Sequence, residues 1–258
     1  MSGFARSRDL VARLAWSAAG VALFVALWSV ASVGLGNAVL LPPPSEVAVG
    51  FAALLADGTL LADVAASLKR VVGGFAIAAS IAVPLALTMA SFRPLSLLLS
   101  PIVLFLRPIP PIAWIPIAIL WFGVGDPPSL FITALAAFFP IFINSYAGGA
   151  SVLPQHVHAA RTLGGRGRHL LLRIYLPSAM PMIATGLRIG LGQSWMAVVT
   201  AELIAAHSGL GYMIQANRLA LETGYVLVGM CVIGLLGAAM SLLLEAIERR
   251  VLVPWKNV

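Results

Sequence analysis

The sequence predicts an all-α membrane protein with six transmembrane helices, and three observations support this fold class. First, 60% of the 258 residues are hydrophobic and 10% are charged, whereas a soluble chain is about 25% charged. Second, six apolar segments are long enough to cross a bilayer, which takes about 20 residues. Third, basic residues lie at the ends of these segments, as in cytoplasmic loops of membrane proteins. The net charge of +7 therefore indicates membrane topology, and no nucleic-acid partner is expected.

The six predicted spans lie within one transmembrane domain, residues 1–258. They are Leu14–Leu35, Val71–Ala90, Leu95–Gly123, Leu130–Gly148, Pro181–Ala205 and Val226–Ile247. Residues 1–13 form an N-terminal extension, 41–70 a segment too polar to span, 71–250 the core spans with a loop at 151–176, and 251–258 a tail. The third span contains several prolines, which interrupt helical hydrogen bonding, so we expect it to be broken. The first span lacks an A-x-A-like cleavage site and is not a signal peptide.

Orientation follows from the basic residues. With the N-terminus in the cytoplasm, eleven lie inside: Arg6, Arg8, Arg13, Arg93, Arg161, Arg166, Arg168, Arg173, Arg249, Arg250 and Lys256. Three lie outside: Lys69, Arg70 and Arg218. This asymmetry predicts that both termini are cytoplasmic.

Two external segments carry local signals. The first opens with LPPPSE, where Ser45 is a candidate N-cap for a short amphipathic helix. The second, Ala206–Tyr225, contains SGLGY, whose glycines suit a tight turn.

The longest and most basic cytoplasmic loop, Ser151–Leu176, carries the most specific pattern. It predicts a short helix over Val157–Leu163 that Gly164 and Gly165 end, with a small apolar face made by Ala159, Ala160 and Leu163. A second helical stretch, Arg168–Tyr175, leads to Pro177 and the next span. From the residues alone, the loop either inserts into a groove of another protein or is an ordinary solvated loop.

The same loop resembles the EAA motif of ABC-importer permeases, EAA-x3-G-x9-I-x-LP. Ala159, Ala160, Gly164, Ile174, Leu176 and Pro177 stand at the motif's spacing, and His158 stands where the motif has glutamate. The resemblance implies a coupling helix that docks on an ATP-binding subunit. The residues it assigns to this contact are His158, Ala159, Ala160, Arg161, Leu163, Gly164, Ile174, Leu176 and Pro177.

Three further segments resemble the nitrate/sulfonate/taurine subfamily: Arg107–Gly125, Phe138–Asn144, and TGLRIGLGQSW with the AELIAA and GLGY that follow. This resemblance implies the type I (MetI-like) permease fold in the bacterial inner membrane. The implied partners are a second permease copy, two ATPase subunits carrying ATP and magnesium, a periplasmic or lipid-tethered binding protein, and membrane lipid. The implied cargo is a small oxyanion such as a sulfonate, taurine or nitrate, or else a thiamine-pyrimidine precursor or an aromatic acid.

The sequence predicts no cofactor and no catalysis on this chain. A P-loop needs GxxxxGK[ST], and neither lysine, Lys69 or Lys256, follows a glycine. The histidines, His156, His158, His169 and His207, lack acidic or thiolate neighbours, so no metal site is expected. A membrane-embedded enzyme is therefore disfavoured. A stand-alone secondary transporter is also disfavoured, because Glu202 is the one acidic residue near a span before Glu245.

Arg107 and Arg188 fall within predicted spans, where a charged group costs about 2.5–3.5 kcal/mol or more. They either attract an anion along the path or pair with carbonyls exposed by Pro108, Pro110 and Pro111, or with Glu202. Asn144, Trp195 and Glu202 complete the candidate path, with Glu202 at its outer mouth. Trp195, with Trp114 and Trp121, is also expected to serve as a packing or interface anchor.

Gly186 and Gly190 form a GxxxG pattern, which suits intrachain packing or contact near a dimer axis.

Overall fold

The computed structural model describes the backbone of residues 2–252 and the side chains of residues 15–250. The described chain is helical, without a strand. It forms two compact units: the residues up to Leu60 with 214–230, and residues 61–213 with those from Cys231 onward. Most of the predicted tail at 251–258 lies outside the described residues.

The first unit holds α1 (Ser2–Leu35) and α2 (Pro44–Ala56). The indole N–H of Trp28 donates to the Pro42 carbonyl at 3.0 Å and the Ser32 hydroxyl to the Leu41 carbonyl at 2.9 Å, and both bonds hold the connection between the helices. Pro43 is the N-cap residue of α2, so the assignment of Ser45 as N-cap is wrong. Pro44 has no N–H to satisfy at the first helical position, which favours this start.

Helix α3 (Thr59–Ser91) begins twelve residues before the predicted span. The hydroxyl and the backbone N–H of Thr59 donate to the Asp57 carboxylate at 2.7 and 2.9 Å, and these bonds hold the pKa of Asp57 below its ordinary value. The helix therefore begins before the predicted start of the span at Val71. Its 33 residues extend about 50 Å, more than the roughly 30 Å of a hydrocarbon core, so the external position of 59–70 stays a prediction.

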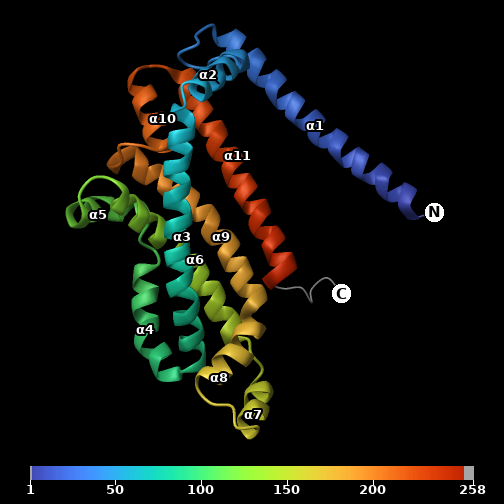
Figure 1. The fold of residues 1–258 in the computed structure, drawn as a ribbon, viewed down its shortest axis with the longest axis vertical. Coiled ribbons are helices and arrows are strands. Elements are labelled where there is room, and N and C mark those ends of the chain that lie inside the picture. The colour runs from blue at the N-terminus through green and yellow to red at the C-terminus, as the bar shows by residue number, and fades with distance from the viewer. Residues whose placement is uncertain (1, 253–258) are drawn as a thin grey trace. The chain divides into compact units, whose positions relative to one another are not determined.

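In the second unit, α6 (Asp126–Ala150) packs between α3 and α9 (Leu176–Ala205), as Figure 1 shows. Its buried residues recur every three or four positions, which marks the faces turned toward its neighbours. They are Pro128, Ser129, Ile132, Thr133, Ala136, Ala137, Ile141, Phe142, Ser145, Gly148 and Gly149. A Cβ on Gly148 would lie 3.0 Å from Ala179 of α9, and one on Gly149 would lie 2.6 Å from Ala90 of α3. Small residues thus allow close helix approach.

The third span is broken, as its prolines predict. Helix α4 (Arg93–Leu106) is followed by η1 (Pro111–Trp114) and α5 (Ile115–Phe122), with a bend of 90° between the two parts. The start of α4 lies beside the C-terminal end of α6, where the hydroxyls of Ser96 and Tyr146 are 2.8 Å apart. Asp126 begins α6 at its other end. With the bent pair counted as one span and five continuous apolar helices, the described residues contain up to six candidate spans by length and composition.

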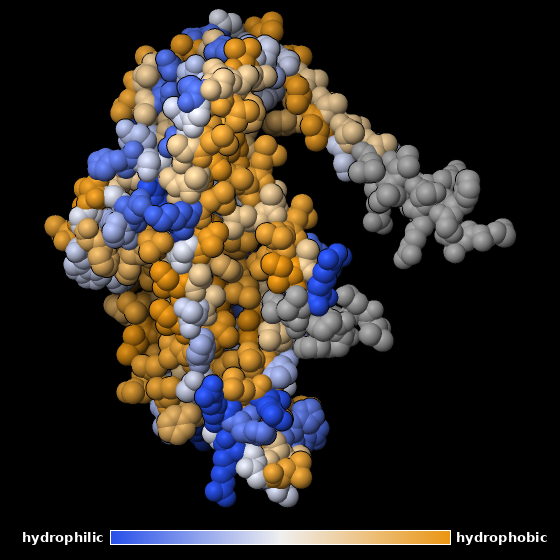
Figure 2. All heavy atoms as spheres, in the orientation of Figure 1, coloured by the Kyte–Doolittle hydropathy of each residue, from blue (hydrophilic) through white to orange (hydrophobic). Residues whose placement is uncertain are grey.

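The remaining helices, apart from α10 (Leu210–Leu219), lie close to the predicted positions. Helix α10 was not predicted, whereas α11 (Thr223–Ile247) contains the sixth span and continues into a π-helix, η3 (Glu248–Leu252). In the basic loop, α7 (Pro154–Thr162) and α8 (Arg168–Leu170) confirm the two helical stretches. A π-helix, η2 (Leu171–Tyr175), joins α8 to α9 without a break. Hydrophilic residues gather around α7 and α8, whereas hydrophobic residues cover the long helices of this unit (Figure 2).

Candidate functional site

A cavity of about 360 Å³ lies in the second unit where the broken third span meets α6 and α9. Its polar lining consists of Arg107, Asn144 and Gln193. The rest of its wall is apolar: Ile109, Pro110, Pro111, Leu135, Ala136, Phe139, Pro140, Ile143 and Ile189. Apolar walls with a few polar groups are typical of small-molecule sites, and no acidic side chain lines this one.

The local sequence accounts for this geometry. Prolines follow Arg107 and stop α4, which leaves that residue at the helix C-cap and turns the chain away. The Asn144 amide donates to the Pro140 carbonyl at 2.8 Å, which fixes its position on α6. Gln193 lies one turn beyond Gly190, whose missing side chain lets α9 approach Ile141.

The Arg107 guanidinium forms no hydrogen bond or ion pair with any described residue. It lies about 21 Å along α4 from Arg93 at 1.5 Å per residue, and the residue is exposed. A smaller cavity of about 160 Å³, also lined by Ser100 and Tyr146, shares Arg107 with the first. The backbone carbonyls at the C-terminus of α4 favour a cation there, but the charge remains available to a ligand.

The other candidate path residues lie elsewhere. Arg188 forms an ion pair with Glu248. Trp195 is buried beside Gly237 of α11, and its indole N–H has no acceptor among the described residues. Glu202 is buried in a separate network. Of the five predicted path residues the structure thus brings only Arg107 and Asn144 together. Gln193 was missed, although its position one turn after Gly190 was a signal that it shares that face of the helix.

The separate network centres on Arg70, which sequence reasoning treated only as an external charge. Its side chain is 3% exposed. Nη1 donates to Glu202 and to the Ser208 carbonyl, both at 2.7 Å. Nε donates to Asp126 at 2.9 Å, and Nη2 donates to Asp126 and, at 2.9 Å, to the Ser208 hydroxyl. All five guanidinium N–H groups are therefore used, across α3, α6, α9 and the loop before α10.

The Glu202 carboxylate is equally well satisfied. The Ser67 hydroxyl lies 2.8 Å from both of its oxygens, and the Gly211 N–H donates to it at 2.9 Å. The Leu210 N–H donates to the Ser67 hydroxyl at 2.9 Å. A buried charge pair is sustained when hydrogen bonds satisfy the remaining polar groups, and that condition holds here.

Two glycines of the SGLGY segment make room for these charges. Gly209 has φ +108°, and a Cβ there would lie 2.5 Å from the Glu202 carboxylate and 2.7 Å from Nη1 of Arg70. Its N–H donates to Asp63 at 2.7 Å. A Cβ on Gly211 would lie 2.6 Å from the Val199 carbonyl. The tight turn predicted from these glycines is thus the wall of a buried ion-pair site.

The two carboxylates that bind Arg70 differ in environment. The side chain of Glu202 is fully buried, whereas that of Asp126 is 55% exposed. Removing one partner of a fully buried pair costs about 3–5 kcal/mol, and this applies to Arg70–Glu202, whereas the contact with Asp126 has one buried and one half-exposed partner. The Arg70–Glu202 half of the network is therefore the more deeply buried one.

The basic loop Ser151–Leu176, called the coupling loop below for its predicted role, lies at the end of the α6–α9 pair opposite this network. Leu163 is 89% exposed, and His158 and Ala159 are also exposed, with Ala160 half-buried. Gly164 ends α7 with φ +86°. The Gly165 N–H donates to the Ala160 carbonyl at 2.8 Å. The apolar face expected on this helix is therefore accessible to a partner.

The GxxxG pair packs within the chain. A Cβ on Gly186 would lie 2.9 Å from Asn144, and one on Gly190 would lie 2.8 Å from the Ile141 side chain. Both glycines thus face α6.

Among the described residues, no group of three His, Cys, Asp or Glu side chains could hold a metal ion.

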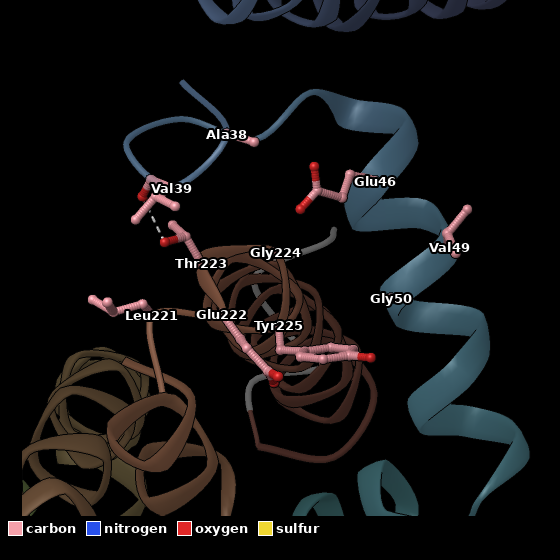
Figure 3. A pocket seen from close by; sticks show the side chains of 10 residues that line it. All are labelled: Ala38, Val39, Glu46, Val49, Gly50, Leu221, Glu222, Thr223, Gly224 and Tyr225. Atoms are coloured by element: carbon pink, nitrogen blue, oxygen red, sulfur yellow. Dashed lines mark hydrogen bonds between the residues drawn. The ribbon is translucent and has the colours of Figure 1, made fainter. Parts of the chain in front are cut away.

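A further cavity, of about 320 Å³, lies within the first unit between the chain before α2 and the start of α11 (Figure 3). The Thr223 hydroxyl donates to the Val39 carbonyl at 2.7 Å at its edge. Glu46 and Glu222 both line it. Two carboxylates oppose an anionic ligand, so this cavity does not suit an anionic cargo.

Residues 60–253 match the family described as "binding-protein-dependent transport system inner membrane component". A probable ABC transporter permease of Brucella abortus (strain 2308) is 41% identical over 88% of this chain and 93% of its own length. The taurine transport system permease of Escherichia coli (strain K12) is 37% identical over 90% of this chain and 86% of its own. The nitrate import permease of Synechocystis sp. (strain PCC 6803) is 30% identical, over 90% and 86% respectively.

Proposed function

Because the chain belongs to the binding-protein-dependent transport system inner membrane component family, and is thus the non-catalytic, multi-pass permease subunit of an ABC importer, we propose that it carries a small oxyanion past Arg107. The observation that supports this is the guanidinium of Arg107, which is exposed and lines two cavities without a partner among the described residues. In a site of low dielectric constant, such a charge attracts an anion and repels a cation. The named cargoes of two relatives, taurine and nitrate, are consistent with this class.

The transport cycle that we propose uses the subunits that are typical of the family. Two copies of the permease pair around the path, and two ATPase subunits, which bind ATP and magnesium, dock on α7 from the cytoplasm. A periplasmic or lipid-tethered binding protein delivers the cargo from outside. The exposed face of Ala159 and Leu163 supports docking at α7. The excess of basic residues in the predicted inner loops supports a bacterial inner-membrane topology with both termini cytoplasmic.

Within this cycle Arg107, Asn144 and Gln193 form a transit site of weak affinity. An amide and a guanidinium donate hydrogen bonds to oxygen acceptors, and the apolar wall leaves room for a small organic group. Selectivity rests with the external binding protein, which leaves the choice among a sulfonate, taurine and nitrate to that subunit. A thiamine-pyrimidine precursor or an aromatic acid is the second candidate cargo, and the apolar share of the wall is the observation that favours it.

The test compares Arg107→Gln with Arg107→Lys in the complex reconstituted with its ATPase and binding protein. Glutamine should lower uptake of a sulfonate or nitrate at least about tenfold, the factor that corresponds to 1.4 kcal/mol. Lysine should retain more uptake because it keeps the charge. Arg93→Gln at the other end of α4 is the matched control. Equal losses for glutamine and lysine, or a cationic cargo, would refute the proposal.

A further inference from the structure

We propose that the contact between Arg70 and Asp126 is the separable half of an outer latch, which must open for the transport path to face outward. The latch consists of Ser67, Arg70, Asp126, Glu202 and the loop at 206–211. The inference rests on the proposed topology, which places this end of α3, α6 and α9 outside, and does not depend on the chemistry of the cargo.

One side of the latch behaves as a single block. Glu202 of α9 receives hydrogen bonds from Ser67 and Arg70 of α3 and from the Gly211 N–H. Each of these side chains is nearly or fully buried. Separating α3 from α9 would leave a charge without a partner and away from water, so these helices and the loop move together.

The other side can separate. The Asp126 carboxylate is half exposed and also lies 3.8 Å from the exposed Lys69 ammonium, so water and that lysine can replace the guanidinium when the contact breaks. Arg70 would still keep its bonds to Glu202 and to Ser208. No buried charge is stranded, and this asymmetry decides which contact opens.

The chain around Asp126 is suited to such a movement. Asp126 is the first residue of α6, and it follows a connection in which Gly123 and Gly125 have φ +77° and +134°. Glycine adopts these angles without strain and can change them readily. The Gly125 N–H donates to the Ala205 carbonyl at 2.8 Å, so the connection stays attached to the end of α9 while the start of α6 moves.

The block is linked to the cytoplasmic side by one helix. From Leu176, directly after the coupling loop, α9 runs uninterrupted to Glu202, about 39 Å at 1.5 Å per residue. Displacement of the loop by the ATPase is therefore transmitted to the latch. Because coupling between two sites is reciprocal, weakening the latch should shift the complex toward the state that the active ATPase favours.

The test measures ATP hydrolysis by the assembled complex without its binding protein. Asp126→Asn should raise this basal activity about twofold to fivefold, the range expected for loss of an ion pair with one exposed partner, and should lower the number of cargo molecules imported per ATP. Asp126→Glu should keep the wild-type values. Glu46→Gln, which removes an exposed carboxylate from the first unit, is the matched control and should change neither value.

A second arm separates gating from simple stability. Raising the salt concentration from about 50 mM to about 0.5 M screens exposed charges, so basal activity should rise in the wild type and stay unchanged in Asp126→Asn. Unchanged or reduced basal activity in Asp126→Asn, or the same salt response in both proteins, would overturn the latch. A cationic cargo would refute the oxyanion proposal and leave this result intact, so the two failures are distinguishable.

Discussion

Arg188 in α9 forms an ion pair with Glu248, the residue that directly follows α11. This pair neutralises the charge of Arg188, which the sequence had made a candidate for the anion path. Counted from Ala205 at 1.5 Å per residue, Arg188 lies about 26 Å down α9, in the half of the helix nearer Leu176. The pair therefore ties the end of α11 to that half of α9.

We expect Arg188→Gln to lower the yield of folded permease, because Glu248, only 13% exposed, would lose its counter-ion at a cost of about 1–3 kcal/mol. Glu248→Gln should have a similar effect, and the exchange Arg188→Glu with Glu248→Arg should restore much of the loss. Yield and melting temperature of the purified complex measure this. Normal yield with reduced uptake in Arg188→Gln would instead assign Arg188 to the path.

Gly209→Ala should destabilise the protein strongly. The new Cβ would collide with the Glu202 carboxylate and with Arg70, and disruption of a buried ion pair costs about 3–5 kcal/mol. Gly58→Ala is the matched control, because Gly58 also has positive φ but nothing lies within 4 Å of its Cβ position, which leaves only about 1–2 kcal/mol of backbone strain. Thermal unfolding in detergent compares the two. Equal decreases in melting temperature for the two variants would show that the structure adjusts to avoid the collision between the new Cβ and the ion pair.

Gly186→Leu should separate α9 from α6 and prevent stable folding. Its side chain would occupy the space of Asn144 and Ile141, and overpacking costs about 1–3 kcal/mol or more. Gly234→Leu in α11, where no atom lies within 4 Å, should be tolerated. Expression with monodisperse size-exclusion behaviour is the measurement. A stable Gly186→Leu variant would show that α6 does not pack as described.

Ala160→Glu or Gly164→Leu should abolish stimulation of the ATPase by loaded binding protein without preventing insertion of the permease. The first places a charge on the face of α7, and the second puts a side chain on a residue with φ +86°, which strains the helix end. His158→Glu should be tolerated because it restores the motif residue at an exposed position. Wild-type stimulation in both loop variants would refute docking at α7.

Topology is testable with single cysteines in a Cys231→Ser background. A cysteine at Arg166 should be inaccessible to an impermeant thiol reagent in intact cells. Cysteines at Gly58 and at His207, both exposed, should react; His207 is preferable to its neighbour Ser208, which binds Arg70. Labelling at position 166 in intact cells would invert the proposed orientation.

The spans were predictable because each is encoded locally, by a run of apolar residues or by prolines that interrupt one. The loop helix α7 was predictable for the same reason, since glycines stop it. The start of α3 was not, because Lys69 and Arg70 resemble the end of a span when they are read as solvated charges. Their partners, Asp126 for both residues and Glu202 for Arg70, stand 56 and more residues away, where local patterns carry no information.

A signal for the buried network was nevertheless present. Predicted topology already placed Arg70, Asp126 and Glu202 near the outer ends of three spans, and an acidic residue inside an apolar segment needs a partner. The cavity around Arg107 was less accessible to prediction. Its shape depends on the 90° bend of the third span, and proline positions predict a break but not the angle.

The π-helix η2 directly precedes α9. The direction in which the side chains of α9 point therefore depends on the number of residues in η2. A π turn closes with one residue more than an α turn, so deletion of one residue within Leu171–Tyr175 can restore an α-helix with every later side chain still pointing the same way. An added residue would rotate α9 by about 100° and carry Gly186 off α6. Evolution can therefore shorten this segment by one residue far more easily than it can lengthen it.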